Sequence, residues 1–355
     1  MKNKKILCAF LAAFLCVTAV SCAGSKEKSG ESQTESESTT EQETEETTEP
    51  EIHAKVSAYG TMADLTKYVT STEVTPPLWK VTDPETNNEI YIMGTIHILP
   101  NTFTDFPDYV MDIYENSDGV AVEYDTSQIQ TDIRAMMAYQ QLFLYDDGSV
   151  ITDHISDETY QKSKAYFESI GAYSKELDQF SAGYWYNQIS SVMLLRLENL
   201  SLTGVDSTFV ENAKNDGKEV VNIETIEIQA GAIDGYSDEL VDYLLSEIMD
   251  DIDEIDEYAE QLGELYNCWA TGNIDEMLDE ELEEMEELPE DLKDDYAEYM
   301  DIMLYNRNKG MADKASEFLK DGKNYLFMVG SAHYAGDKGV DDLLAEMGYT
   351  VEKIA

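Results

Sequence analysis

YIMGTIHILP, residues 91–100, is an apolar run that stops at a glycine and presents a histidine three residues later. FMVGSAHYAG, residues 327–336, repeats this arrangement far along the chain. The repetition stands out because the 355-residue chain has only four histidines. Each apolar run is typical of a buried strand, and the glycine suits a sharp turn and a close approach of the backbone. The two stretches therefore predict two strands that each lead to a histidine.

Further apolar runs extend these two strands into a sheet. LWKV and EIYIM, with turn residues between them, predict a hairpin that leads into the first glycine–histidine element. GVAV, EVVNIE and YTVEKI predict three more strands. The spacing of apolar residues is helical over 127–202 and 237–304, which indicates a large helical insertion. The predicted fold class is α/β (α+β), with a mixed central sheet built from both ends of the folded body.

Residues 1–21 have the layout of an export signal. Three lysines precede an apolar stretch, and small residues precede Cys22. The stretch is too short and too one-sided to be a lasting membrane span. The AVS run before Cys22 resembles a bacterial lipobox, in which cleavage leaves a lipid-modified cysteine, although Ala19 stands where leucine is commonest. The alternative is an ordinary signal peptide in which Cys22 is incidental.

Residues 22–55 are rich in Ser, Thr and Glu and almost free of apolar side chains, which predicts a disordered acidic tether. The folded body then spans 56–355. Once the signal is removed and Cys22 carries lipid, only Cys268 remains, so the sequence predicts neither a disulfide nor a cysteine zinc cage. The net charge of −51 argues against binding to nucleic acid or anionic headgroups. We expect a lipid-anchored protein exposed outside the cytoplasm at the cell membrane.

Four predicted strands lead to a residue that can bind a metal ion or move a proton. These residues are His97, Glu123, Glu224 and His333. Because the carboxyl ends of neighbouring strands meet at one crevice in open α/β sheets, the four side chains can converge there. Two imidazoles with one or two carboxylates suit a divalent metal, which lowers the pKa of bound water, while a second carboxylate can serve as general base.

Other interpretations of these residues stay open. Both strand-end histidines can be core residues bonded to the backbone, so that the two elements only shape the sheet. Asp125 competes with Glu123, because the two share one face of an extended segment. Glu224 can instead cap the helix that follows it. His53 and His154 fall in the tether and in a helix-entry loop, where we expect a solvated structural role.

Several stretches resemble, in order, the successive motifs of the TraB/GumN family, which includes the Tiki membrane proteins. They are LWKV…EIYIMGTIHILP, VAVEYD, LTGVDSTFVENAKNDGKEVVNIETIEIQ, YNRNKGMADKASEFL and LFMVGSAHYAGDKGVDDLLAEMGYTV. The resemblance runs from about Leu78 to Ile354, essentially the whole folded body. It implies a fold related to the Tiki and erythromycin-esterase-like proteins.

In Tiki-like members the two histidines and an acidic residue are associated with a divalent metal and peptidase activity. The resemblance therefore implies His97, Glu123 and His333 as a site for Mn, Co or Zn. We predict catalytic roles for Glu123, Glu224 and Arg307. Arg307 suits a clamp for a substrate carboxylate or an oxyanion, with a surface or structural ion pair as the alternative. The remaining matching positions are predicted to support the site: Gly94, Gly330, Asp206, Gln229, Asn308, Tyr334 and Asp337.

Two functions are compatible with this sequence. The first is a surface-anchored, metal-dependent hydrolase that acts on a peptide or another small molecule, through the residues above. The second is a lipoprotein that binds or sequesters a peptide signal in the same cleft without cleaving it. Asp206 can be either a catalytic residue or a residue of a helix N-terminus.

Overall fold

The computed structural model describes residues 59–276 and 285–354. The predicted export signal (1–21), the predicted tether (22–55), Cys22 and His53 lie outside the described residues. Within the two described ranges, every helix is too short or too polar to cross a membrane.

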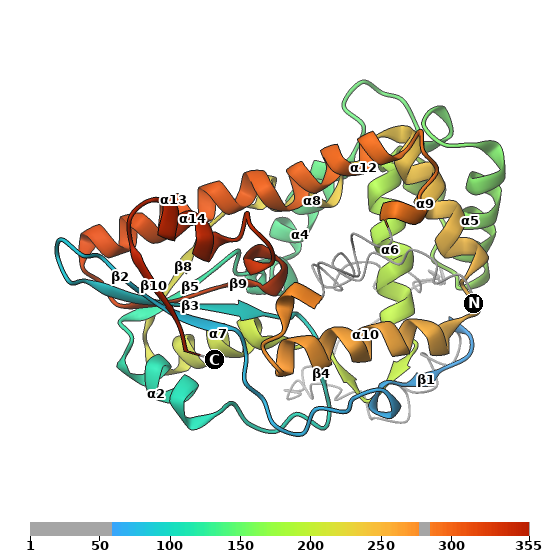
Figure 1. Ribbon diagram of the computed structural model, residues 1–355. Helices are drawn as coiled ribbons and strands as arrows, with labels where there is room; N and C mark the ends of the chain where they lie inside the picture. Colours follow the sequence, from blue (N-terminus) through green and yellow to red (C-terminus); the bar gives the residue numbers. More distant parts are fainter. Residues whose placement is uncertain (1–58, 277–284, 355) are drawn as a thin grey trace, which may run out of the picture.

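A six-stranded mixed sheet forms one side of the molecule (Figure 1). The strand order is β10-β2-β3-β9-β5-β8, and the neighbours β3, β9, β5 and β8 run parallel. β2 is antiparallel to both of its neighbours. The strands are β2 (Leu78–Thr82), β3 (Glu89–Thr95), β5 (Gly119–Val122), β8 (Glu219–Asn222), β9 (Tyr325–Gly330) and β10 (Thr350–Lys353). The two short two-stranded sheets pair β1 (Ala63–Asp64) with β6 (Leu197–Glu198) and β4 (Leu99–Pro100) with β7 (Leu200–Ser201).

The central strands are buried on both faces. In β9, Phe327 and Val329 join one hydrophobic cluster, whereas Leu326 and Met328 join another. A strand covered on both sides has no polar face, which is why its sequence is a continuous apolar run rather than an alternation. One face packs against α13 (Asn306–Asp321) and α14 (Val340–Glu346), and the other against α2 (Asp108–Asn116), α7 (Val205–Asp216) and α10 (Ile255–Ala270).

The remaining helices form a second body beside the sheet (Figure 1). The α-helices are α3 (Ser127–Thr131), α4 (Ile133–Gln140), α5 (Asp157–Ser169), α6 (Ala182–Leu194), α8 (Ile226–Ile233), α9 (Asp238–Asp250) and α12 (Lys293–Met300). The shorter turns are η2 (Leu65–Lys67), η3 (Gln141–Phe143), η4 (Ile151–Asp153), η5 (Lys175–Gln179) and η7 (Ser331–Tyr334), all of 3₁₀ type, and the π-helical η6 (Asp301–Tyr305).

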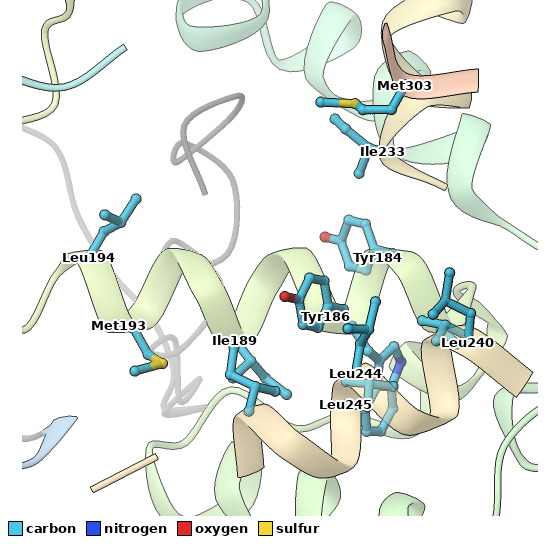
Figure 2. Close-up of a cluster of buried hydrophobic side chains, with 14 of the residues drawn as sticks. Tyr184, Tyr186, Ile189, Met193, Leu194, Ile233, Leu240, Leu244, Leu245 and Met303 are labelled. Carbon is cyan, nitrogen blue, oxygen red and sulfur yellow. The ribbon is translucent and has the colours of Figure 1, made fainter. Parts of the chain in front are cut away.

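Helix α6 lies at the centre of this helical body and is buried along almost its whole length. Figure 2 shows Tyr186 and Ile189 of α6 on the side of α9, and Tyr184 on the side of Ile233 and Met303; all belong to one hydrophobic cluster. The labelled residues on α6 and α9 are Tyr184, Tyr186, Ile189, Met193, Leu194, Leu240, Leu244 and Leu245. The helix is buried on every side, polar Asn187, Gln188 and Ser190 included, so other parts of the chain enclose it.

The helical body and the sheet are joined by one unbroken helical run. α12, η6 and α13 follow one another without a gap from Lys293 to Asp321 (Figure 1). The π-helical turn in the middle widens the helix locally, and such turns occur frequently at functional sites. Residues of α13 therefore pack against the sheet, while the same helical run continues into the helical body.

The predicted mixed α/β fold is confirmed. Strands are present at each predicted position, and strands from both ends of the body share the sheet. The prediction of helix up to residue 202 was wrong at its end, because α6 stops at Leu194 and short strands follow. The buried Arg196 side chain bonds the backbone oxygens of Thr61 and Ile252, and Asn199 has a φ of 60°, so the backbone turns instead of continuing the helix.

A stability test follows from Asp234, whose carboxyl group is largely enclosed at the end of α8. Burial raises its pKa to about 6. Below about pH 3.8 both the folded and the unfolded chain hold this proton, so burial of the group has no cost there. As the pH rises through 6 the folded chain must ionise a buried group, and that advantage is lost. The Asp234→Asn variant should therefore be more stable than the parent at pH 7.5, by on the order of 1–2 kcal/mol.

Urea unfolding at pH 4, 5.5 and 7.5 measures this difference. The gap between Asp234→Asn and the parent should shrink as the pH falls. The exposed Asp313, on α13, provides the control substitution Asp313→Asn, for which we expect no such trend. A constant difference at all three pH values would contradict the explanation.

Candidate active site

The four strand-end residues come together at one edge of the sheet. β3, β9, β5 and β8 are parallel neighbours, so their carboxyl ends meet there. His97 follows β3, Glu123 follows β5, Glu224 follows β8 and His333 lies in η7 directly after β9. The backbone N–H of Glu224 donates to the carbonyl of Glu123 at 3.0 Å, which extends the strand pairing to these two residues.

Gly330 lies at the centre of this group. A Cβ atom on Gly330 would lie 3.3 Å from Glu123 Oε1, 3.8 Å from His333 Cδ2 and 3.9 Å from His97 Nε2. The glycine thus leaves open the space on which both histidines and Glu123 converge. Gly94 instead lets Ser331 and Pro77 pack closely against the strand. A Cβ at Gly94 would be 2.7 Å from the Ser331 hydroxyl oxygen and from a Pro77 carbon.

Each histidine is oriented through its Nδ1 atom. His97 Nδ1 lies 3.1 Å from Asp206 Oδ1, and His333 Nδ1 lies 2.5 Å from Asn308 Oδ1. The Asn308 amide is itself fixed, because its Nδ2 donates to the backbone oxygen of Lys338 at 2.8 Å. Partners of this kind set the tautomer and the ring angle of histidines that bind metal ions.

The His333 ring presents a lone pair to a carboxylate. Since Asn308 Oδ1 can only accept, His333 Nδ1 carries the proton and Nε2 of the neutral ring does not. Nε2 lies 3.6 Å from Glu123 Oε1, too far for a hydrogen bond. Burial and the nearby Arg307 guanidinium lower the pKa of His333 to about 3, so the ring is neutral near pH 7. Two electron-rich atoms therefore face each other across this gap.

Arg307 joins the two carboxylates on the other side of Glu123. Its Nη2 donates to Glu123 Oε2 at 2.6 Å and to Glu224 Oε2 at 2.8 Å, while its Nε donates to Glu224 Oε1 at 3.0 Å. Gln229 Nε2 donates to Glu123 Oε2 at 3.2 Å and also to Glu224 Oε2. All four side chains are buried. Arg307 thus forms a buried structural ion pair, and its donors bind the chain's own carboxylates rather than an incoming substrate carboxylate.

In this network the pKa values of the two glutamates shift in opposite directions. Burial opposes ionisation of Glu123, but Arg307, both histidines and the Gly330 N–H outweigh it and lower the pKa of Glu123 to about 2. For Glu224 burial prevails over Arg307, so its pKa is raised. His97 is half-buried; its desolvation disfavours the positive form, but Asp206 and Glu123 stabilise that form and raise the pKa of His97.

The sequence left alternative roles open for three residues, and the structure shows the contacts that each of them makes. Asp206 lies in the first turn of α7 and its Oδ1 lies 3.1 Å from His97 Nδ1, while a catalytic role for it stays a prediction. Glu224 is not the cap of α8, because the Thr225 side chain accepts from Ile228 N instead. Asp125 pairs with Lys214 at 2.7 Å, away from Glu123, since β5 ends at Val122 and the strand alternation stops there.

Three further residues lie outside the group around Gly330. Tyr334 stacks on Trp79 with ring centroids 4.8 Å apart, and Asp337 lines a separate pocket beside them. His154 has a structural role at the end of η4, where it contacts Asp238 and stacks on Tyr145.

The sequence analysis overlooked Gly204. A Cβ there would lie 2.4 Å from the backbone Cα and C atoms of His97, so only glycine allows this approach. Val205 N, next in the chain, donates to the carbonyl of Ile96. The glycine before Val205 in the LTGVD stretch was the available signal, although nothing in the sequence says that it faces His97.

Comparison with known proteins places these residues in a family. Residues 77–353 match the TraB/PrgY/gumN family. The chain belongs to this family. The prediction made from the sequence motifs is therefore confirmed, and the matched range of this TraB/PrgY/gumN member includes every site residue from Gly94 to Asp337.

A more distant similarity connects this TraB/PrgY/gumN member to a Tiki protein. Metalloprotease TIKI2 of Danio rerio is 22% identical over 328 residues, with 81% of this chain and 62% of that protein covered. The chain thus spans a little under two thirds of that relative's length. No solved structure gives a significant match.

Replacement of Arg307 tests the buried ion pair. The Arg307→Met variant keeps much of the side-chain volume but leaves Glu123 and Glu224 close together without their cation. We expect a loss of about 3–5 kcal/mol in the free energy of unfolding, measured by urea denaturation. Adding Glu224→Gln should restore part of that loss, because one of the two unpaired charges is removed.

Arg134 on the exposed face of α4 provides the matched control. Arg134→Met should change the free energy of unfolding by no more than about 0.5 kcal/mol. An Arg307→Met variant as stable as this control would show that the ion pair does not hold the site together.

Proposed function

We propose that this TraB/PrgY/gumN protein is a divalent-metal-dependent hydrolase that acts on peptides. The observation that carries the proposal is the approach of His333 Nε2 to Glu123 Oε1 at 3.6 Å. A neutral imidazole nitrogen and a carboxylate oxygen both carry lone pairs, so they repel each other unless a cation lies between them. The distant similarity to a protein named as a metalloprotease supports the same chemistry.

The residues around Gly330 fit a divalent ion in their chemical type. His97, His333 and Glu123 would hold it, because imidazole nitrogen and carboxylate oxygen suit Mn, Co and Zn. When bound, such an ion supplies Lewis-acid activation of water and of a peptide carbonyl.

The protein's own groups prepare this site. Asp206 and Asn308 fix the two rings, and Arg307 with Gln229 holds Glu123 Oε2 so that Oε1 faces the histidines. Glu224 accepts from Arg307 on both of its oxygens, which favours a positioning role over direct proton transfer.

A pocket beside Asp206 offers room for a substrate. Its volume is about 340 Å³, and its walls come from α7 and from the segment after β5. Tyr124, Thr203, Ser207 and Lys214 are among its lining residues, which gives it both hydrogen-bonding groups and an aromatic surface. A peptide backbone requires such a mixture of polar and apolar contacts. We therefore propose this pocket as the place where a peptide lies next to His97.

Metal content and peptide hydrolysis, measured together, test the proposal. We expect about one equivalent of Mn, Co or Zn in the chain purified without chelator, and loss of both metal and hydrolysis in the His97→Ala and His333→Ala variants. His154→Ala is the control, since His154 lies outside the site and should affect neither. Metal and hydrolysis that survive in both site variants would contradict the proposal.

Binding without cleavage is the second candidate function. One observation favours it: Arg307 Nη2 pairs with Glu123 Oε2 at 2.6 Å, so the carboxylate of the site already has a cation of the chain beside it. In that case the same pocket would retain a peptide signal and release it unchanged. Recovery of an intact peptide from a saturable, metal-independent complex would support this function over hydrolysis.

We further propose that Cys22 carries a lipid that anchors the protein to the outside of the cell membrane. The support is the small-residue run before Cys22 and the acidic tether after it. Radiolabelled palmitate should enter the full chain expressed in bacteria and should not enter the Cys22→Ala variant, which should also leave the membrane fraction. Equal labelling of both proteins would exclude lipidation at Cys22.

A further inference from the structure

The pocket beside Asp206, in which we place the peptide, follows one side of α7. Two rows of side chains with a spacing of four residues line it: Asp206, Val210 and Lys214 in one row, Ser207 and Glu211 in the other. With a rise of about 1.5 Å per residue, Glu211 lies roughly 7.5 Å along the helix from Asp206, the length of about two residues of extended peptide. A peptide next to His97 can therefore bring one of its side chains to Glu211.

Glu211 is the charged residue of this pocket that lacks an ion-pair partner within residues 59–276 and 285–354. The Asp125 carboxylate pairs with the Lys214 ammonium at 2.7 Å, and Asp206 Oδ1 lies 3.1 Å from His97 Nδ1. Glu211 itself is exposed. Its negative charge is therefore accessible to a group that enters the pocket.

The rest of the pocket suits a long basic side chain. Tyr124, Leu202 and Val210 give it apolar surface, and Leu202 is 42% exposed. Lysine and arginine have an alkyl stem that packs on such a surface and a cation at its tip. A glutamate side chain also has an alkyl stem, but Glu211 would repel its carboxylate.

The charge of the whole chain acts in the same direction. With a net charge of −51, the protein attracts cationic solutes and repels anionic ones. This general attraction favours basic peptides whatever the position of their basic residue. Selection at one position of the peptide requires a local charge such as that of Glu211.

We propose that the peptide bound in this pocket carries a lysine or arginine side chain whose cation pairs with Glu211. Glu211 is thereby a specificity-determining residue, and the substrate class is basic peptides. The inference rests on the proposed function for the place of the peptide next to His97. It applies to a cleaved peptide and to a retained one alike, because both candidate functions use the same pocket.

A series of acetylated hexapeptide amides tests the proposal. Each peptide is alanine except for one lysine, placed at each position in turn, and a matched set has norleucine, which keeps the stem without the charge. Calorimetric titration of the full chain at pH 7.5 and 50 mM NaCl gives the dissociation constants, and mass spectrometry of the same samples shows whether a peptide is cleaved. Where cleavage occurs, kcat/KM replaces the dissociation constant.

At one position of the peptide, we expect the parent to prefer lysine over norleucine by about three- to fivefold more than the Glu211→Gln variant does, as for an exposed ion pair. This preference should decrease at 500 mM NaCl, because salt screens exposed charges. Glu211→Lys should prefer glutamate at the same position. Glu115→Gln, on the exposed face of α2, removes the same charge outside the pocket and should behave like the parent.

The outcomes separate this inference from the proposed hydrolysis. A lysine preference that depends on Glu211, without cleavage, would support the role of Glu211 and contradict the hydrolase. Cleavage with the same preference in the parent and in Glu211→Gln would keep the hydrolase and overturn the inference. If Glu115→Gln weakened the preference as much as Glu211→Gln, the acidic chain as a whole would be responsible, which would also overturn it. Absence of saturable binding for every peptide of the series would overturn it as well.

Discussion

The buried contact of Arg307 with Glu123 and Glu224 is the interaction on which the site depends. Two carboxylates at the ends of adjacent parallel strands repel each other in a buried environment, and a guanidinium group between them removes that repulsion. Arg307 comes from α13, and the π-helical turn η6 lies immediately before that helix. The long helical run from α12 to α13 thus connects the helical body to the charged centre of the sheet edge.

This constraint also determines how Glu123 faces the histidines. One of its oxygens is held by Arg307 and Gln229, and the other accepts from the Gly330 N–H and lies near His333. Asp206 contacts Nδ1 of the His97 ring, and Asn308 contacts Nδ1 of the His333 ring. Each member of the group therefore has its position set by a second residue, which is the arrangement that precise chemistry requires.

The strands and the convergence of four side chains were predictable because both depend on local patterns. A strand buried on both faces has to be continuously apolar, and parallel strands bring their carboxyl ends to one edge. The partners of Arg307 were not predictable in the same way, since Glu123 lies 184 residues away in sequence and Glu224 lies 83 away. Likewise, the opposite directions of His333 and Tyr334 depend on the path of η7, where consecutive side chains point to different surroundings.

The sequence by itself determined the sheet, the glycines at its edge and the residue types available for chemistry, because these follow from hydrophobic pattern and backbone sterics along the chain. Only the tertiary structure decided which carboxylate faces the histidines, which one holds Arg307, and that Gly204 must be small to let His97 approach. These outcomes depend on distances between segments that are remote in sequence. Electrostatic and steric effects act through space at a few ångströms, so they exist only once the fold has brought those segments together.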